Sequence, residues 1–139
     1  MTNLPNPEPS HTRTVLLSHM RYGAGDSWVG GLDEAFRPCG LTLFRATTRA
    51  AALNTVEKGG LAAAILIDDR PRVDGLTMLR LIRSIDMILP CWLVTAKATR
   101  RTLEAALNLS VCGVMEAPTD VIEFTRTLVR YLDDPRRHN

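Results

Sequence analysis

The sequence predicts an α/β fold: a single doubly wound, five-stranded parallel sheet with helices on both faces. Short apolar runs alternate five times with segments whose apolar residues recur at helical spacing, as expected where helical crossovers join parallel strands. The third run, AAAILIDD, is continuously apolar up to its two aspartates, which is typical of a strand covered on both faces. A length of 139 residues suits one domain with a substantial core.

The first two strand and helix pairs follow from local patterns in the N-terminal half. TVLLSH is a short apolar run, and a glycine-bearing loop leads from it into DSWVGGLDEAFRPCG, where Asp26 or Ser27 can cap a helix. LTLFRA predicts the second strand. The alanine-rich segment TTRAAALNTVEKGG predicts a helix that ends at Gly59 and Gly60.

Three further pairs are expected in the C-terminal half. AAAILIDD is followed by the helical segment GLTMLRLIRSID, PCWLVTA by TRRTLEAALNLS, and GVMEAP by TDVIEFTRTLVRYL. Asp120 and Glu123 should open the last helix as a capping box. The 3.6-residue period of the helix after the third strand is carried by Leu76, Leu79, Ile82 and Arg83.

Composition narrows the function classes. Seventeen basic and fifteen acidic residues leave a formal charge of +2, too near balance to favour nucleic acid or an anionic membrane surface as partner. Cys39, Cys91 and Cys112 are widely spaced without a CxxC pattern, so we expect reduced core thiols and no metal site. No signal peptide or membrane span is evident, which favours a cytoplasmic protein. The expected divisions are a flexible leader at 1–12, the domain at 13–132 and a polar tail at 133–139.

Four segments, in this order and at these spacings, resemble the receiver domain of bacterial response regulators. They are ATTRAAAL, RPRVDGLTMLRLIR, LPCWLVTAKA and GVMEAP, and the resemblance covers roughly residues 13–132. It implies a flavodoxin-like sheet with strand order 2-1-3-4-5. It also implies signalling partners, namely a histidine kinase, a phosphotransfer protein or another regulator.

The resemblance further implies a phosphorylation pocket, which this sequence keeps only in part. Receivers use an acidic pair after the first strand to hold Mg²⁺, an acceptor aspartate after the third, a hydroxyl after the fourth and a lysine after the fifth. Ser18 and His19 replace the acidic pair and Ala117 replaces the lysine, whereas Thr95 keeps the hydroxyl. Because a phosphoryl group approaching a carboxylate must have its charge neutralised, we expect a degenerate receiver with no catalytic residue, metal or cofactor.

The position of the acceptor aspartate is ambiguous. Counting back from Gly75 at the family's spacing reaches Ile67, whereas the end of the apolar strand marks Asp68. We favour Asp68, with a shortened loop, as the equivalent of the acceptor. The competing interpretation is that Asp68 and Asp69 only cap the strand end and the next loop. His19 lies on a neighbouring strand in this topology and could form an imidazole–carboxylate pair with Asp68.

The sequence therefore predicts a stand-alone atypical response regulator that is not an enzyme and acts by protein–protein interaction. One alternative is a phosphorylatable single-domain regulator that uses Asp68. A second is a small nucleotide-binding enzyme, suggested by the loop GAGDSWVGG, although Trp28 stands where GxGxxG requires its third glycine. Thr95 could act as a switch hydroxyl, but Val114 stands where the family's coupled aromatic lies.

An interaction face is expected around the fourth helix, the fifth strand and the fifth helix. On the fifth helix, one stripe should face the sheet, formed by Val121, Phe124, Leu128 and Leu132. A second stripe should lie on the surface, formed by Ile122, Arg126 and Val129. On the fourth helix, Leu103 and Leu107 are expected to face inward. The opposite face carries Arg101, Glu104 and Asn108. Receivers similar to this chain use this face to bind targets or to dimerise, so a homodimer is expected there, with Arg126 near its centre.

Overall fold

The computed structural model of the chain describes residues 12–18, 26–68, 74–117 and 120–134. The expected leader, the tail beyond residue 134, His19, Asp69 and the glycine loop before residue 26 lie outside these residues. The elements, in chain order, are β1 (Arg13–Ser18), α2 (Asp26–Phe36), the 3-10 helix η2 (Arg37–Cys39), β2 (Leu41–Ala46), α3 (Arg49–Lys58), β3 (Leu61–Asp68), α4 (Gly75–Ile85), β4 (Cys91–Thr95), α5 (Arg100–Asn108), β5 (Gly113–Glu116) and α6 (Val121–Asp133).

The five strands form one parallel sheet in the order β2-β1-β3-β4-β5, which confirms the predicted topology. In the register of the sheet, Ser18 pairs with Leu66, Asp68 with Thr95, and Thr95 with Glu116. The carboxyl ends of β1, β3, β4 and β5 therefore meet at one edge. In doubly wound sheets this edge is where ligands bind.

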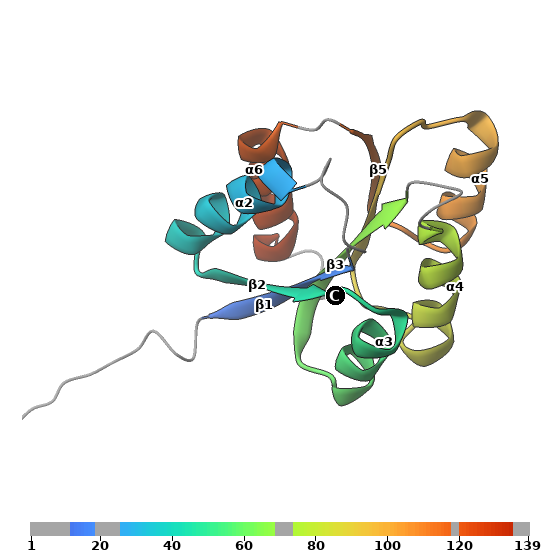
Figure 1. Cartoon of the computed structure of the whole chain (residues 1–139), viewed down its shortest axis with the longest axis horizontal. Helices are drawn as coiled ribbons and strands as arrows, with labels where there is room; N and C mark the ends of the chain where they lie inside the picture. The colour runs from blue at the N-terminus through green and yellow to red at the C-terminus, as the bar shows by residue number, and fades with distance from the viewer. Residues whose placement is uncertain (1–11, 19–25, 69–73, 118–119, 135–139) are drawn as a thin grey trace, which may run out of the picture.

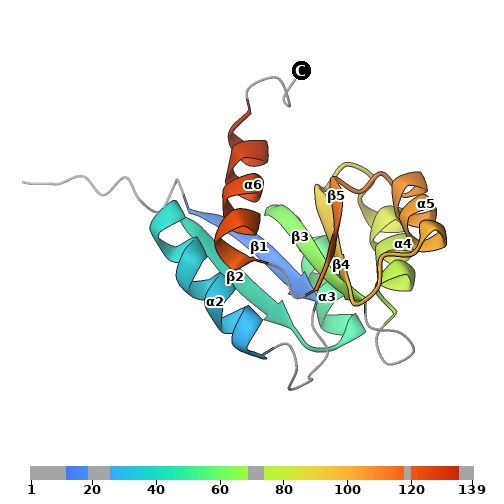
Figure 2. The same ribbon diagram turned by 90° about the horizontal axis from the view of Figure 1, so that it is seen from above.

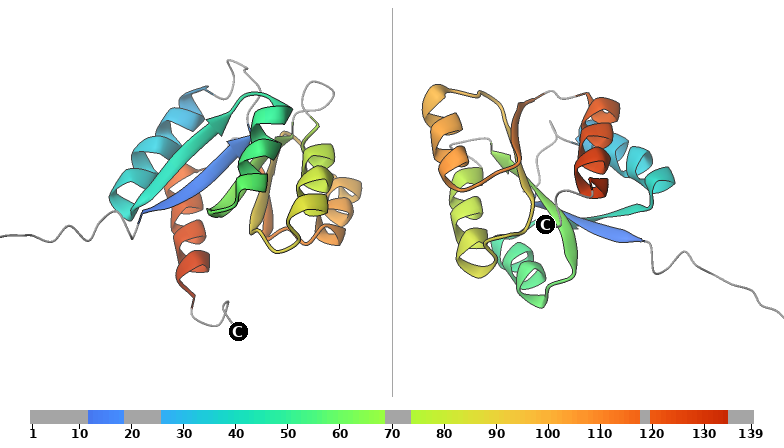
Figure 3. Two further views of the ribbon diagram at one scale, coloured as in Figure 1. Left: turned by 90° about the horizontal axis from the view of Figure 1, so that it is seen from below. Right: turned by 180° about the vertical axis from the view of Figure 1, so that it is seen from behind.

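Helices cover both faces of the sheet. α2 and α6 lie side by side on one face, and α3, α4 and α5 lie on the other (Figures 1 and 2), a division that the views from below and behind repeat (Figure 3). Under α2 and α6 the core contains a cluster of aromatic rings: Trp92 makes edge contacts with Phe124 and Tyr131, and Trp28 makes a tilted contact with Phe124. No helix within the described ranges is both long and apolar enough to span a membrane.

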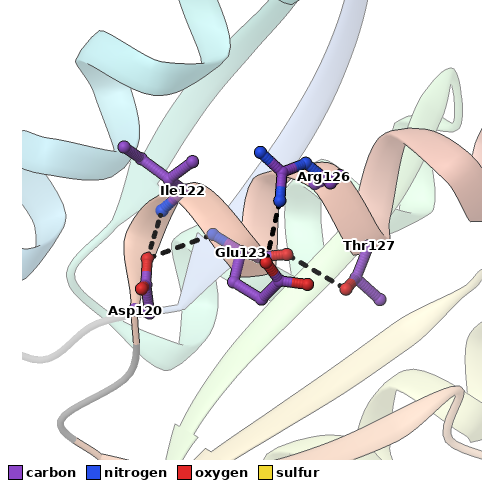
Figure 4. A network of polar contacts seen from close by, with 5 residues as sticks. All are labelled: Asp120, Ile122, Glu123, Arg126 and Thr127. Carbon is purple, nitrogen blue, oxygen red and sulfur yellow. Dashed lines mark hydrogen bonds and ion pairs between the residues drawn. The ribbon is translucent and has the colours of Figure 1, made fainter.

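The last helix begins as its sequence predicts, with one difference. The Asp120 carboxylate accepts hydrogen bonds from the backbone N–H groups of Ile122 and Glu123, at 3.0 and 3.1 Å (Figure 4). A reciprocal capping box would need the Glu123 side chain to turn back toward Asp120. Instead, Glu123 accepts a bond from Arg126 at 2.9 Å. The cap is therefore one-sided, and Glu123 stabilises the first turn through an ion pair.

The orientation expected for the fourth helix, α5, is wrong. Leu107 is 65% exposed and Leu103 is 37% exposed, whereas Thr102 and Ala106 are buried. Small side chains allow a helix to pack closely on its neighbours. The Thr102 hydroxyl accepts a bond from Thr99 at 3.0 Å, so its burial leaves that oxygen satisfied. The exposed side of α5 consequently carries two leucines.

The expectation of three core thiols is wrong for one of them. Cys39 is exposed at the end of η2, Cys112 is half-buried and Cys91 is fully buried. All three are free. Burial raises the pKa of the Cys91 thiol to about 12, so this group remains a neutral thiol at physiological pH and behaves as a small apolar side chain.

Replacing Thr125 with valine is expected to stabilise the protein by about 1 kcal/mol. Thr125 is 4% exposed, and its hydroxyl oxygen is buried with no hydrogen-bond partner among the described residues. Valine keeps the shape and removes the desolvation cost. The matched control is Thr102→Val, which deletes a bonded hydroxyl and should destabilise. Thermal denaturation measures both. A shift of the two melting temperatures in the same direction would contradict this account of Thr125.

Candidate functional site

The candidate site lies at the carboxyl edge of the sheet, where Asp68 ends β3. Asp68 is 2% exposed. Its Oδ1 accepts the backbone N–H of Gly75 at 2.8 Å, and its Oδ2 accepts the Thr95 hydroxyl at 3.1 Å. Its backbone oxygen accepts the N–H of Ala96 at 3.2 Å. One residue therefore joins the end of β3, the first residue of α4 and the end of β4.

Local sequence explains why α4 begins against Asp68. The Asp74 side chain caps the helix by accepting the Thr77 N–H at 3.0 Å, which fixes Gly75 as the first helical residue. A Cβ at Gly75 would lie 2.8 Å from the Asp68 Cβ and 2.9 Å from the Ile67 oxygen. Only glycine allows the helix to approach this closely.

The structure places Asp68 at the strand end and Ile67 one position inside it. Ile67 packs against the apolar core under α2 and α6, whereas Asp68 pairs with Thr95 across the sheet. This is the arrangement expected if the loop before Asp74 is shortened.

The loop between β4 and α5 is tied to both of its neighbouring strands. The Thr95 hydroxyl that meets Asp68 also lies 3.3 Å from the Lys97 backbone N–H, which donates to it. Glu116, at the end of β5, accepts the N–H of Ala98 through Oε2 at 2.9 Å. Sequence reasoning missed Glu116, although an acid at a strand end next to Ala117 could have been a signal.

The structure describes only some of the other residues predicted for the pocket. Ser18 ends β1 and is 6% exposed. Ala117 is exposed just beyond β5, and its backbone N–H donates to the backbone carbonyl oxygen of Thr95 at 2.8 Å. His19 and Asp69 lie outside the described residues, so the His19–Asp68 pair stays a prediction.

The described donors do not fit a magnesium ion. Mg²⁺ demands octahedral oxygen coordination and is usually held by one or two carboxylates. Here Ser18 offers a neutral hydroxyl, and each Asp68 carboxylate oxygen already accepts a hydrogen bond from the chain. Across the described ranges, no three His, Cys, Asp or Glu side chains gather as a metal would need.

The structure does not bring the two halves of the expected interaction face together. Ile122, Arg126 and Val129 of α6 line a hollow that they share with Ala35 and Cys39 of α2 and η2. They thus face α2, on the opposite side of the sheet from α5 (Figures 1 and 2). Arg101, Glu104 and Asn108 are exposed on α5. These six residues therefore lie on opposite sides of the sheet, and their use as one interaction face stays a prediction.

Comparison with solved structures identifies the fold. A CheY-like response regulator receiver domain protein of Methanospirillum hungatei superposes with a TM-score of 0.77 at 14% identity, covering 92% of this chain and 99% of that one. A two-component response regulator of Clostridium difficile gives 0.74 at 17% identity, with coverages of 92% and 99%. The receiver domain of the sensor histidine kinase PA1611 of Pseudomonas aeruginosa, which has a magnesium ion coordinated in its active-site cleft, gives 0.71 at 19% identity, with coverages of 88% and 99%.

These similarities show a receiver-type fold across most of the chain. No protein-family model matches the sequence, and no curated protein matches it. Function must therefore be argued from the residues of the site.

Proposed function

We propose that this protein acts in signal transduction through protein–protein contact, as a pseudo-receiver without Mg²⁺-dependent aspartyl phosphorylation. The main support for this proposal is the burial and the hydrogen bonding of the Asp68 carboxylate. Its carboxylate is almost completely buried, and its two oxygens accept bonds from the Gly75 N–H and the Thr95 hydroxyl.

The chemistry of phosphoryl transfer explains why this state opposes phosphorylation. An attacking carboxylate oxygen must be accessible in line with the leaving group, and cations must neutralise the developing charge. At Asp68, both carboxylate oxygens are in a buried site and each already accepts a hydrogen bond from the chain. Ser18 and Ala117 supply no charge in place of the metal-binding acid and the lysine of receivers.

The same contacts support a signal that does not depend on a phosphodonor. In receivers the hydroxyl after the fourth strand moves inward to meet a phosphoryl group. Thr95 already points to Asp68, and Glu116 already holds the following loop at Ala98. The surface beside this loop is then presented constitutively.

That surface is the exposed side of α5. It carries the leucines Leu103 and Leu107, with Arg101, Glu104 and Asn108 around them. Exposed apolar side chains rimmed by charge suit a protein partner. A histidine kinase, a phosphotransfer protein or another regulator fits this role.

A phosphorylatable receiver is the second candidate, because Asp68 and Thr95 do stand together at the strand ends. One measurement, the intact mass of the protein after treatment with a phosphodonor, distinguishes the two functions. After incubation with acetyl phosphate and Mg²⁺, the intact mass is expected to stay unchanged. The control is Asp68→Asn, treated in the same way. An adduct of one phosphoryl group on the wild type that is absent from Asp68→Asn would replace the pseudo-receiver by the second candidate.

A further inference from the structure

A second surface lies on the other face of the sheet, between α2 and α6. It is a hollow of about 520 Å³, whose lining includes Ala35, Cys39, Ile122, Arg126, Val129 and Arg130. Ile122 stands at its edge and is 65% exposed. Burying an isoleucine is worth about 1.5–3 kcal/mol, so a partner that covered this side chain would gain from it.

The shape of the hollow follows from small residues on α2. The two helices touch at Gly31, where an added Cβ would lie 3.3 Å from a methyl group of Val121. Farther along α2, Ala35 is too small to fill the space beside α6. Gly30 is exposed and an added Cβ there would meet nothing within 4 Å. Packing within the chain therefore accounts for Gly31 but not for Gly30, which leaves the outer side of α2 open to close approach.

Arginines line the α6 side of the hollow, and an exposed acid lies on α2 next to one of the lining residues. Arg126 and Arg130 lie on the α6 side, and Glu34 is exposed on α2, next to Ala35. Within the described part of the chain, Glu34 and Arg130 form no ion pair, while Arg126 is bonded to Glu123 and remains 57% exposed (Figure 4). The acid and the arginines are thus available to an outside partner.

We propose that a second copy of the chain covers this hollow in a two-fold dimer, with α2 of each copy against α6 of the other. An isologous interface must be complementary to itself. A two-fold axis along the hollow places the Glu34 side of one copy over the Arg126 and Arg130 side of the other, and the reverse contact follows by symmetry. Each Ile122 then packs on the small residues Gly30 and Ala35 of the facing α2.

This dimer is expected to be weak and concentration-dependent. Helices of 11 and 13 residues are roughly 16 and 20 Å long, and such a pair covers less than the roughly 800 Å² per partner of a standard stable interface. The contact is separate from the α5 surface, so it can form whether or not the proposed signalling function is correct.

Charge exchange between two variants tests the arrangement. Glu34→Arg alone, and Arg126→Glu with Arg130→Glu, should each raise the dissociation constant by about tenfold or more, measured by sedimentation velocity over a concentration series. Mixing the two variants in equal amounts should restore association, because both contacts across the axis again join opposite charges. Circular dichroism checks that each variant is folded.

Two further variants separate this surface from others. An added Cβ at Gly30 meets no atom within 4 Å, so Gly30→Leu should leave the fold intact and abolish the dimer. Leu107→Glu, on α5, should leave association unchanged. A wild type that stays monomeric at its highest soluble concentration overturns the proposal. The proposal is also overturned if the dimer is insensitive to the α2 and α6 variants, or if the mixture of the two charge variants fails to associate. Loss of the dimer in Leu107→Glu would likewise contradict it.

Discussion

Replacing Gly75 with alanine is expected to destabilise the protein by about 2–4 kcal/mol. The new methyl group would lie 2.8 Å from the Asp68 Cβ, 2.9 Å from the Ile67 carbonyl oxygen and 3.0 Å from the Asp68 Cα. These atoms belong to a central buried strand and cannot yield as the tip of a flexible side chain would. Relief requires α4 to move outward, which stretches the 2.8 Å bond from the Gly75 N–H to Asp68.

Urea denaturation in dilute solution measures this effect, and Gly30→Ala is the matched control. Gly30 also lies in a helix, α2, but an added Cβ there meets nothing within 4 Å. Alanine should therefore stabilise α2 by about 0.5–1 kcal/mol through its better helix propensity. If Gly75→Ala were as well tolerated as Gly30→Ala, α4 could not begin as close to β3 as the structure places it.

Strands were the most predictable part of this fold, and for β3 the reason is its burial, which leaves a continuous apolar run. LTLFRA becomes β2 without change of limits, and AAAILIDD becomes β3 shifted by one residue at each end. The fifth strand is shorter than expected and ends at Glu116. Glu116 turns toward the loop before α5, a contact between distant segments that no local pattern encodes.

The side of a helix that faces the core was less predictable where two sets of residues both followed the helical period. In α5 hydrophobicity alone favours Leu103 and Leu107 as the inner pair, yet Thr102 and Ala106 are buried. The deciding factors are the closeness of the packing and a satisfied threonine hydroxyl, and both depend on the assembled fold. In α6 the inner stripe was predicted correctly: Phe124 and Leu128 are buried. The direction of its outer stripe, toward α2, could not be read from the helix alone.

For the candidate site, the sequence could predict which residues end the strands but not what they bind. Parallel strands bring Asp68 and Thr95 together by topology. That Gly75 donates to the Asp68 carboxylate depends on how closely α4 packs against the end of β3, and that is a property of three-dimensional packing. The bonds that the Asp68 carboxylate accepts join β3, α4 and β4 at this edge of the sheet.

The contacts of Arg83 also could not be predicted from the pattern of its own helix. The sequence placed it in the buried period of its helix, and the structure finds it half-buried at the end of α4. Its guanidinium group donates to four backbone carbonyl oxygens, at 2.8 to 3.1 Å. These oxygens belong to Asp86, Leu89, Leu109 and Ser110. One side chain therefore joins the turn before β4 to the carboxyl end of α5, where Ser110 has a left-handed backbone with φ of 60°.

Replacing Arg83 with methionine is consequently expected to cost about 2–4 kcal/mol in the free energy of unfolding. Methionine preserves the aliphatic packing but leaves the four carbonyl groups without their charged donor, and the Ser110 turn loses a bond that holds its unfavourable backbone. Arg83→Lys should recover only part of the loss, because one ammonium group cannot span the planar fork of a guanidinium.

Arg80→Met is the matched control for Arg83→Met, and urea denaturation compares the two. Arg80 is exposed on the same helix, one turn earlier, and its replacement should change stability by less than about 0.5 kcal/mol. The comparison keeps the charge, the helix and the substituted side chain the same, so the difference isolates the four carbonyl contacts. Equal stabilities for Arg80→Met and Arg83→Met would show that the ends of α4 and α5 are held by apolar packing alone.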